Sequence, residues 1–274
     1  MSAPALSVLM PVLNPHPEYF PRAVRSVLQQ SFGDFELIIT EDPGDSAAAP
    51  LLARFDDPRI IHQRNETRTR LIVQRNQGIQ TARAPLIALV DSDDICEPQR
   101  FERQLAFLQQ NSDVDVVSSH LTIIDTEDRV VGYRRYPTDH ESIMAALPLY
   151  NPIAQPAVMF RRDKVRMQGG YTYQSYNVNS DYDLWCRLAN TGARFAVLNE
   201  PLVRYRIHPG GLKSAKLRDV IAATIDIKKQ HMAHRMTLKA HARLLAERAL
   251  LTLPPSVVLK LFMKMQYRKT LDAS

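Results

Sequence analysis

The sequence predicts an α/β protein with a mostly parallel β-sheet flanked by helices and a helical extension at its C-terminus. Strand and helix patterns alternate over residues 1–120, which is typical of a parallel sheet with crossover helices. Within them, the unbroken apolar segment Pro85–Val90 has the composition of a strand buried on both faces. Helical spacing of apolar residues from about Ala215 onward indicates the extension. We therefore expect a main domain over residues 1–212, in two parts of 1–120 and 121–212, and an extension over 213–274.

The alternation in the first part can be followed from the N-terminus. A strand at Ser7–Val12 precedes a helix at Tyr19–Gln30, in which apolar residues recur every three or four positions. The later elements are a strand at Phe35–Thr40, a weak helix at Pro50–Phe55, a short strand at Arg59–His62, a helix at Leu71–Arg83, the strand before Asp91, a helix at Gln99–Asn111 and a strand at Val114–His120.

Residues 121–212 are less regular. A helix is predicted at Asp181–Thr191. Two short strands, Val197–Leu198 and Val203–Ile207, flank a predicted turn at Glu200–Pro201. In the extension, Pro254–Pro255 separates two predicted helices.

Composition places the chain among globular proteins with a core, since 45% of the residues are hydrophobic and 23% are charged. Its two cysteines form no disulfide framework, and no apolar run approaches the roughly 18 residues of a membrane span. We therefore expect a cytoplasmic protein. The net charge of +6 is uneven, because residues 213–274 hold 13 Lys+Arg and 4 Asp+Glu, or +9, which leaves −3 for residues 1–212.

An acidic turn, Asp91-Ser92-Asp93-Asp94, directly follows the predicted buried strand. Open α/β sheets bind ligands at the carboxyl ends of their strands. Closely spaced carboxylates repel each other, and a divalent cation that also holds a diphosphate would compensate them. The alternative is an ordinary acidic turn.

Several segments form a recognisable series. They are Ser7–Asn14, Ala23–Gln30, Phe35–Asp42, Arg75–Ile79, Asp91–Asp94, Ser180–Trp185 and Tyr205–Pro209. In this order and spacing they resemble the family 2 glycosyltransferases, which have the GT-A fold, and the resemblance covers roughly residues 6–212. It implies an inverting enzyme that transfers a sugar from a UDP- or dTDP-linked donor to a glycan or lipid-linked acceptor, in cell-surface polysaccharide synthesis.

The resemblance also implies a donor site in residues 1–120. Asp42 corresponds to the carboxylate that reads the nucleobase, and its alternative is a turn residue before Pro43. Arg70 or Arg75 would support the base or the phosphates, or else be a surface arginine on a helix. The remaining donor-binding candidates are Pro11, Val12, Leu13, Asn14, Asp91 and Ser92.

The same resemblance implies a divalent metal, Mn²⁺ or Mg²⁺, as cofactor. Asp93 corresponds to the direct metal ligand, and Asp94 to a cap of the turn or of the following helix. His208 corresponds to a histidine that completes the coordination of metal or diphosphate, although a lone histidine can also be structural.

The resemblance places the acceptor in residues 121–212, with Asp181 as the catalytic base. Asp183 is expected to cap or to pair with Arg187 at i,i+4. Trp185 would be either an acceptor platform or a core residue, and Gln155 is a weak acceptor candidate. The chain departs from the family pattern at Ser180, where a second acid is usual, and at Gln155, Ala84–Pro85 and Arg70. A Gln-x-x-Arg-Trp motif is absent, which favours transfer of one sugar per encounter.

The C-terminal tail has a basic stripe, Lys260, Lys264 and Arg268, beside an apolar face that includes Leu261 and Phe262. This pattern is typical of a helix that lies on an anionic membrane. We expect a peripheral location on the inner face of the plasma membrane, or else a helix packed on the main domain. Nucleic acid is a poorer partner, because the tail lacks interleaved aromatic residues.

Two functions other than sugar transfer are alternatives for this sequence. A nucleotidyltransferase would need a glycine-rich phosphate loop near the N-terminus, and Pro11–Pro17 contains no glycine. A non-catalytic relative that binds a nucleotide sugar has only the Ser180 substitution in its favour. An enzyme is favoured by the joint presence of Asp42, Asp91, Asp93, Asp181 and His208.

Overall fold

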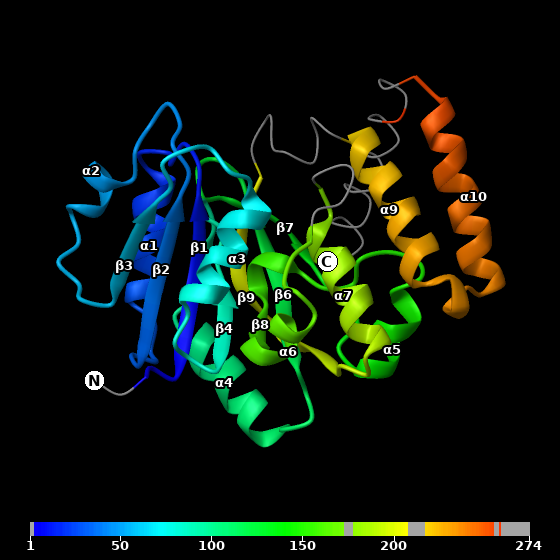
Figure 1. Cartoon of the computed structure of the whole chain (residues 1–274), viewed down its shortest axis with the longest axis horizontal. Coiled ribbons are helices and arrows are strands. Elements are labelled where there is room, and N and C mark those ends of the chain that lie inside the picture. The colour runs from blue at the N-terminus through cyan, green and yellow to red at the C-terminus, as the bar shows by residue number, and fades with distance from the viewer. Residues whose placement is uncertain (1–2, 173–177, 208–216, 255–257, 259–274) are drawn as a thin grey trace.

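The computed structural model describes residues 3–172, 178–207, 217–254 and 258. Its sheet has nine strands in the order β3-β2-β1-β4-β8-β6-β9-β5, with β7 paired to β6. Helices cover both faces of this sheet, and two further helices stand at one end of the molecule (Figure 1). The α/β fold class predicted from the sequence is confirmed, together with helices in the C-terminal part.

The first half of the sheet is parallel. Strand β1 pairs with β2 and with β4, and β2 pairs with β3. All seven residues of β1 and of β2 are buried, as expected for strands covered on both faces. The elements of this half are β1 (Leu6–Val12), α1 (Tyr19–Leu28), β2 (Phe35–Glu41), α2 (Ala49–Leu52), β3 (Ile60–Arg64), α3 (Leu71–Thr81), β4 (Leu86–Leu89) and α4 (Arg100–Gln110). The short strand β5 (Ile95–Cys96) precedes α4 in sequence but belongs to the second half of the sheet, where it pairs antiparallel with β9.

The second half is mixed. Strand β8 lies between β4 and β6 and is antiparallel to both, while β9 is parallel to β6. The elements of this half are β6 (Val116–Ile124), β7 (Val130–Arg134), α5 (His140–Ala146), η1 (Gln155–Ala157), β8 (Met159–Arg161), α6 (Arg162–Met167), α7 (Ser180–Asn190) and β9 (Phe195–Arg206).

One sequence prediction in this half was wrong. Instead of two strands around a turn at Glu200–Pro201, the chain forms the single strand β9, whose register against β6 shifts near Ser119 and His120. The shift accommodates Pro201, which has no N–H to donate to a neighbouring strand.

The C-terminal elements are α9 (Leu217–His231), the turn η2 (Ala233–Arg235) and α10 (Leu238–Thr252). Of the C-terminal helices, α9 packs on α7 and α10 packs on α9. Asn179, which precedes α7, donates to the carbonyl of Val220 and to Thr224, both on α9. Buried Lys228 of α9 binds Glu247 of α10 at 2.6 Å. The predicted helix after Pro255, with its basic stripe, lies outside the described residues.

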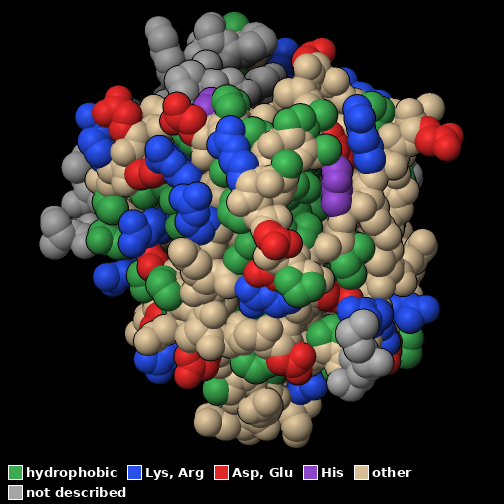
Figure 2. Space-filling view, turned by 90° about the vertical axis from the view of Figure 1, so that its left-hand side faces the viewer, with side chains coloured by type: hydrophobic (Ala, Val, Ile, Leu, Met, Phe, Trp, Pro, Cys, Tyr) green, Lys and Arg blue, Asp and Glu red, His purple; other side chains and the backbone are tan. Residues whose placement is uncertain are grey.

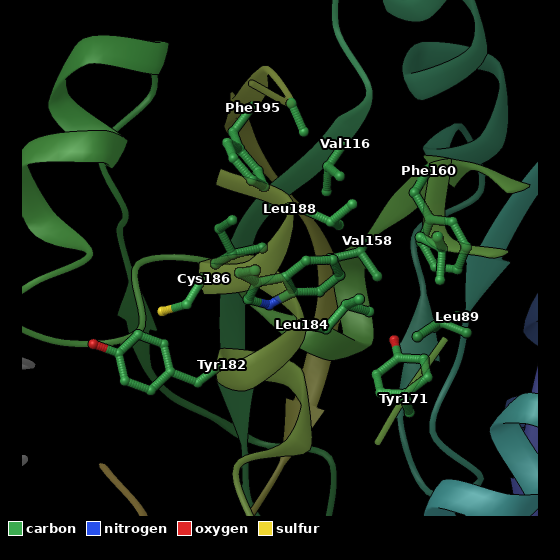
Figure 3. Close-up of a cluster of buried hydrophobic side chains, with 14 of the residues drawn as sticks. Leu89, Val116, Val158, Phe160, Tyr171, Tyr182, Leu184, Cys186, Leu188 and Phe195 are labelled. Atoms are coloured by element: carbon green, nitrogen blue, oxygen red, sulfur yellow. The ribbon is translucent and has the colours of Figure 1, made fainter. Parts of the chain in front are cut away.

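Two layers of buried side chains stabilise the sheet, one on each face. On one face, Leu184 and Leu188 of α7 pack with Val116, Phe160 and other core residues (Figure 3). On the other face, α1 and α4 bury Phe20 and Phe101 among a second set of core residues. The candidate site therefore lies at the ends of strands that the packed core holds in place.

The remaining surface is mixed in character. On the face seen in Figure 2, basic and acidic side chains are interspersed with smaller hydrophobic areas. The edge strand β3 carries exposed Arg64, a charged residue of the kind that discourages edge-to-edge association. No helix among the described residues is both long and apolar enough to span a bilayer.

Candidate active site

The donor-binding candidates meet at one edge of the sheet. Strands β2, β1 and β4 are parallel neighbours, so their carboxyl ends share an edge. Asp42 follows β2 and donates its backbone N–H to the carbonyl of Val12 at the end of β1, at 3.0 Å. Asp91 follows β4 in the same way. The order of the strands therefore brings together residues that are 49 positions apart in sequence.

Asp42 is almost completely enclosed, with 2% of its surface exposed. Its carboxylate accepts from the Thr69 N–H at 2.8 Å, from Thr69 Oγ1 at 2.8 Å and from Asn65 Nδ2 at 2.7 Å. A carboxylate has about four lone-pair positions, so these three donors leave capacity for one more. Asn65 and Thr69 were missed from the sequence, where their only signal is polar residues directly after a strand.

The loop after β1 is held against the loop after Asp42. Asn14 has a positive φ of 50°, and its Oδ1 accepts from the Asp45 N–H at 2.6 Å. A Cβ on Gly44 would come within 2.0 Å of that oxygen, so this close approach requires glycine. The four predicted residues Pro11, Val12, Leu13 and Asn14 thus form the β1 side of the donor edge.

The two candidate arginines differ. Arg75 is 7% exposed, and its Nη2 lies 3.7 Å from Asp91 Oδ1, with the guanidinium 5.4 Å from the ring centre of Tyr171. The surface alternative for Arg75 is therefore wrong. Arg70 is exposed and directly precedes α3. Of these two arginines, Arg75 is the one placed beside Asp91 of the acidic turn.

Within the acidic turn, Asp91, Ser92 and Asp93 are half-buried, whereas Asp94 is 1% exposed. Burial raises the pKa of Asp94 well above its ordinary value, and the charges of Asp91 and Asp93 raise it further. Asp94 Oδ1 accepts from the Arg206 N–H at 2.8 Å. Asp94 thus joins the turn to the end of β9, and the expectation that it caps the following helix was wrong, because α4 begins after Gln99.

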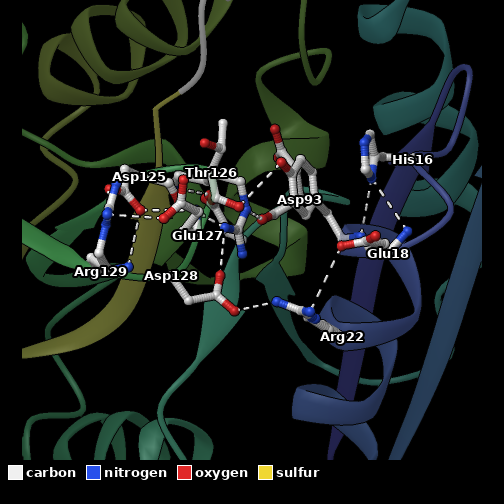
Figure 4. A network of polar contacts seen from close by, with 12 residues as sticks. His16, Glu18, Arg22, Asp93, Asp125, Thr126, Glu127, Asp128 and Arg129 are labelled. Atoms are coloured by element: carbon white, nitrogen blue, oxygen red, sulfur yellow. Dashed lines mark hydrogen bonds and ion pairs between the residues drawn. The ribbon is translucent and has the colours of Figure 1, made fainter.

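Arg206 is a buried residue that the sequence analysis did not single out, although it lies inside the segment Tyr205–Pro209. Its Nε donates to the Asp93 carbonyl at 2.9 Å, and its Nη1 donates to the Asp125 carbonyl at 2.9 Å and lies 2.5 Å from Asp128 Oδ1. Asp128 also pairs with Arg22 of α1 (Figure 4). The acidic turn is therefore fixed to β9, to the turn after β6 and to α1.

The donor set of this turn fits a divalent metal of the Mg²⁺ or Mn²⁺ type. Asp91 and Asp93 offer hard carboxylate oxygens, and such metals bind one or two carboxylates while substrate phosphates and water complete the shell. Within the part of the chain that the structure describes, no group of three or more His, Cys, Asp or Glu side chains could hold a metal alone. His208, the other predicted ligand, lies outside that part.

Asp181 lies in the first turn of α7, and its Oδ2 accepts from Asn151 Nδ2 at 2.8 Å. Burial raises the pKa of Tyr171 to about 12, and the charges of both Asp181 and Asp91 contribute to the increase. The Tyr171 ring centre also lies 5.4 Å from the Arg75 guanidinium, whose Nη2 is 3.7 Å from Asp91 Oδ1.

Asp183 has a structural role, as expected. It binds Arg187 Nε at 2.8 Å, which confirms the i,i+4 pair. It also accepts from Thr172 Oγ1 at 2.9 Å and lies 3.0 Å from His231 Nε2 of α9. Asp183 therefore ties α7 to its neighbours, while Asp181 is half-exposed.

With this geometry described, comparison with known proteins identifies the family. The model of glycosyl transferase family 2 matches residues 7–170, which is more than half of the chain. The chain belongs to this family. It is 31% identical over 229 residues to the O-antigen biosynthesis glycosyltransferase WbnJ of Escherichia coli, a match that covers 82% of this chain and 88% of the relative. It is 26% identical over 238 residues to the UDP-Gal:alpha-D-GlcNAc-diphosphoundecaprenol beta-1,3-galactosyltransferase of Escherichia coli, with 85% and 84% covered.

Solved structures show the same fold. The chain superposes on S. aureus TarS in complex with UDP-GlcNAc with a TM-score of 0.65 at 16% identity, covering 81% of this chain and 66% of that one. It superposes on the mannosyltransferase PcManGT of Pyrobaculum calidifontis, in complex with GDP-Man and Mn²⁺, with a TM-score of 0.64 at 13% identity, covering 94% and 73%. These likenesses confirm the GT-A fold.

Two acceptor candidates of this family 2 glycosyltransferase are buried. Trp185 is 0% exposed and packs in the core, so of its two predicted roles the core role is confirmed and the acceptor platform is wrong. Gln155 is 8% exposed, and its Nε2 donates to the Tyr171 hydroxyl at 2.7 Å. Gln155 therefore positions the Tyr171 side chain through this hydrogen bond. The residue that contacts Asp181 is Asn151, which the sequence analysis missed.

Proposed function

We propose that this glycosyltransferase moves one sugar from a UDP- or dTDP-linked donor to a hydroxyl of a lipid-linked or oligosaccharide acceptor, with inversion, in cell-surface polysaccharide synthesis. One observation carries the proposal: the parallel neighbours β2, β1 and β4 bring Asp42 and the acidic turn at Asp91 to one edge of the sheet, with Arg75 Nη2 3.7 Å from Asp91 Oδ1. Open α/β sheets bind ligands at the carboxyl ends of their strands, and acidic side chains there suit a metal-bound diphosphate.

The donor half would bind the nucleotide. The pyrimidine base would donate its imide N–H to the lone-pair position left on Asp42, between the ends of β1 and β2. Ser92 and Asp91 would lie near the ribose. Arg75 would face the phosphates, where a guanidinium suits anionic oxygens, and exposed Arg70 would support the base or the phosphates from the start of α3.

Asp93 and His208 would hold a divalent metal, Mn²⁺ or Mg²⁺. When bound, this cation neutralises the negative charge that grows on the departing diphosphate. The chemistry of the carboxylates supports the proposal, and so does the Mn²⁺ in the PcManGT complex.

Asp181 would perform the proton transfer. Its free oxygen accepts the proton of the acceptor hydroxyl while that oxygen attacks the anomeric carbon from the face opposite the diphosphate. The bond to the leaving oxygen breaks in the same step, so the configuration at the anomeric carbon inverts. No covalent enzyme intermediate is needed, and one sugar is added per encounter.

A lipid-linked acceptor would bring the enzyme to the inner face of the plasma membrane. The diphosphoundecaprenol named for the beta-1,3-galactosyltransferase relative supports such an acceptor. Helix α10 supports the location: exposed Leu238 and Leu245, 90% and 63% exposed, stand among the exposed basic residues Lys239 and Arg248. The acid of this helix, Glu247, is neutralised by buried Lys228, so α10 presents positive charge toward an anionic surface.

The proposed function is tested by UDP release from a panel of UDP-sugars, including UDP-Gal and UDP-GlcNAc, with GlcNAc-diphosphoundecaprenol or water as the acceptor. We expect one UDP-sugar to turn over, turnover to stop with EDTA, and Mn²⁺ to restore it. Asp93→Ala should lose the response to metal, while the exposed control Asp163→Asn should keep it. Nucleotide-sugar binding without turnover of any UDP- or dTDP-sugar would contradict the enzyme and favour a non-catalytic binding protein.

A further inference from the structure

Asn151 stands on a rigid part of the chain. It lies between α5 and η1, and every residue over Pro152–Phe160 is buried. Ile153, two residues later, is 3% exposed and packs in the core beside α7. Pro152 also restricts the residue before it to extended backbone. The Asn151 side chain therefore starts from a fixed point.

The orientation of the Asn151 amide follows from its two partners. Its Oδ1 accepts from the Ile153 N–H at 3.2 Å, and a backbone N–H can only donate. Its Nδ2 must then point the other way, toward Asp181 Oδ2, at 2.8 Å. An amide N–H₂ donates and does not accept, so it suits the ionised carboxylate, which is the form that a base needs.

The second oxygen of Asp181 is left available. Among the described residues, Oδ1 of Asp181 takes part in no side-chain hydrogen bond, whereas both oxygens of the nearby Asp183 are engaged by Thr172, Arg187 and His231. The position of Asp181 in the first turn of α7 also favours negative charge there. One oxygen is held and the other is open.

We propose that Asn151 is the positioning residue of the catalytic base: it holds Oδ2 of Asp181, directs Oδ1 toward the acceptor hydroxyl and keeps the carboxylate ionised. This inference rests on the proposed function, because it assumes that Asp181 is the base. A carboxylate held in one orientation would already be in a reactive geometry when the acceptor hydroxyl binds.

We expect the fall of kcat at low pH, the acid limb of the pH profile, to report on Asp181 and Asn151 and not on the groups around them. Burial raises the pKa of the neighbours Tyr136, Tyr171 and Cys186, so they stay neutral near pH 7. The charged groups on adjoining elements are Asp91 and Arg75 beside Tyr171, Arg134 beside Tyr136, and Asp183 with Arg187 on α7 itself. His231 of α9 contacts Asp183 and not Asp181 in the hydrogen bonds of the described residues. A His231→Gln control separates its contribution.

The test is the pH dependence of kcat for Asn151→Ala and Asn151→Asp, with the UDP-sugar and acceptor that support turnover of the wild type. For Asn151→Ala we expect kcat to fall about 10- to 100-fold with the donor KM within about 2-fold. The acid limb should move up by about one pH unit, because the carboxylate has lost a donor that favours its charged form. Asn151→Asp should move the limb further, since a second carboxylate disfavours ionisation.

Asn190→Ala is the matched control. Asn190 lies at the other end of α7 and also donates one side-chain hydrogen bond, to the His231 carbonyl at 2.9 Å. We expect its kcat and its acid limb to equal those of the wild type. Thermal unfolding and UDP binding show whether each variant is folded.

The outcomes distinguish a failure of the positioning role of Asn151 from a failure of the proposed function. A wild-type kcat and acid limb in folded Asn151→Ala would overturn the positioning role. A fall that is equal at every pH and accompanied by a raised donor KM would also overturn it, because it would indicate a structural effect. Asp181→Asn, measured in parallel, tests the base itself: if that variant keeps turnover, the base assignment fails, and if wild type turns over no donor, the proposed function fails and this inference with it.

Discussion

Asp42, in the proposed donor half, and Asp181, in the proposed acceptor half, are carboxylates that the protein holds in opposite ways. Asp42 is 2% exposed and accepts hydrogen bonds from Thr69 and Asn65 on both of its oxygens. Among the described residues, half-buried Asp181 accepts one side-chain hydrogen bond, from Asn151. A group that recognises a ligand gains from being held immobile with one lone pair left for the ligand, whereas a group that takes a proton needs an accessible oxygen. The difference predicts different losses when each carboxylate is changed.

The largest effect is expected at Asp181. Asp181→Asn should lower kcat about 10³-fold, because an amide cannot accept the proton of the acceptor hydroxyl. UDP affinity, measured by calorimetry, should stay within about 2-fold of the wild type. A comparable loss of UDP binding would show that Asp181 belongs to the donor half and would remove the contrast with Asp42.

The next effect is expected at Arg206, which ties the acidic turn of the donor half to β9. Arg206→Met should lower the free energy of unfolding by about 2 kcal/mol in urea denaturation, because half-buried Asp128 loses one of its two arginine partners and the Asp93 and Asp125 carbonyls lose a charged donor. The control is Arg129→Gln, since Arg129 is exposed and pairs with Asp125 and Glu127 on the same turn. A change in stability no larger than that of the control would mean that the turn does not depend on Arg206.

At Asp42 a smaller effect is expected. Asp42→Asn should weaken UDP about 10-fold, since one hydrogen bond to a charged acceptor is lost, and GDP much less. The ratio of the two affinities by calorimetry measures the recognition role. An unchanged ratio would show that Asp42 only orders the loop that contains Thr69.

The smallest effect is expected at Glu36, whose hydrogen bonds join neighbouring segments of the proposed donor half. Burial would raise the pKa of Glu36, but hydrogen bonds from Ser7 and Arg83 and the charge of Arg83 outweigh it, so its pKa lies below the ordinary 4.5. A lowered pKa in the folded state stabilises the fold above about pH 4.5, and this stabilisation is lost as the pH falls through the folded value.

Glu36→Gln should therefore cost about 1 kcal/mol at pH 7, and the difference from wild type should shrink in acid. Urea denaturation at pH 7 and pH 4 measures this change. Exposed Glu127→Gln is the control. A difference that is the same at both pH values would contradict the role of the Glu36 charge.

The donor half was largely predictable from the sequence, and the acceptor half was less so. Parallel strands buried on both faces read as continuous apolar runs, so β1, β2 and β4 were predicted nearly to their ends. The acidic residues after β2 and β4 then had to share an edge. In the second half, β7 and the short strands β5 and β8 carry no such signal, because their pairing depends on distant partners.

The site shows the same contrast. Asp42, Asp91 and Arg75 were found from their places after strands or within the Arg75–Ile79 segment. Asn151 and Arg206 were missed because their function depends on contacts with residues 30 and 113 positions away. Trp185 was misjudged as an acceptor candidate because helical spacing alone does not say which face of α7 is buried. These roles depend on tertiary contacts, which the periodicity of the sequence does not reveal.

The most direct test of the account is the anomeric configuration of the sugar in the product. Proton NMR coupling constants of the product, formed by the wild type from a UDP-sugar with an α-linked donor, report that configuration. The account predicts inversion to the β-linked product, because Asp181 leaves one oxygen free to deprotonate an acceptor that attacks in a single step. Retention of the α configuration would contradict the role of Asp181 as a base.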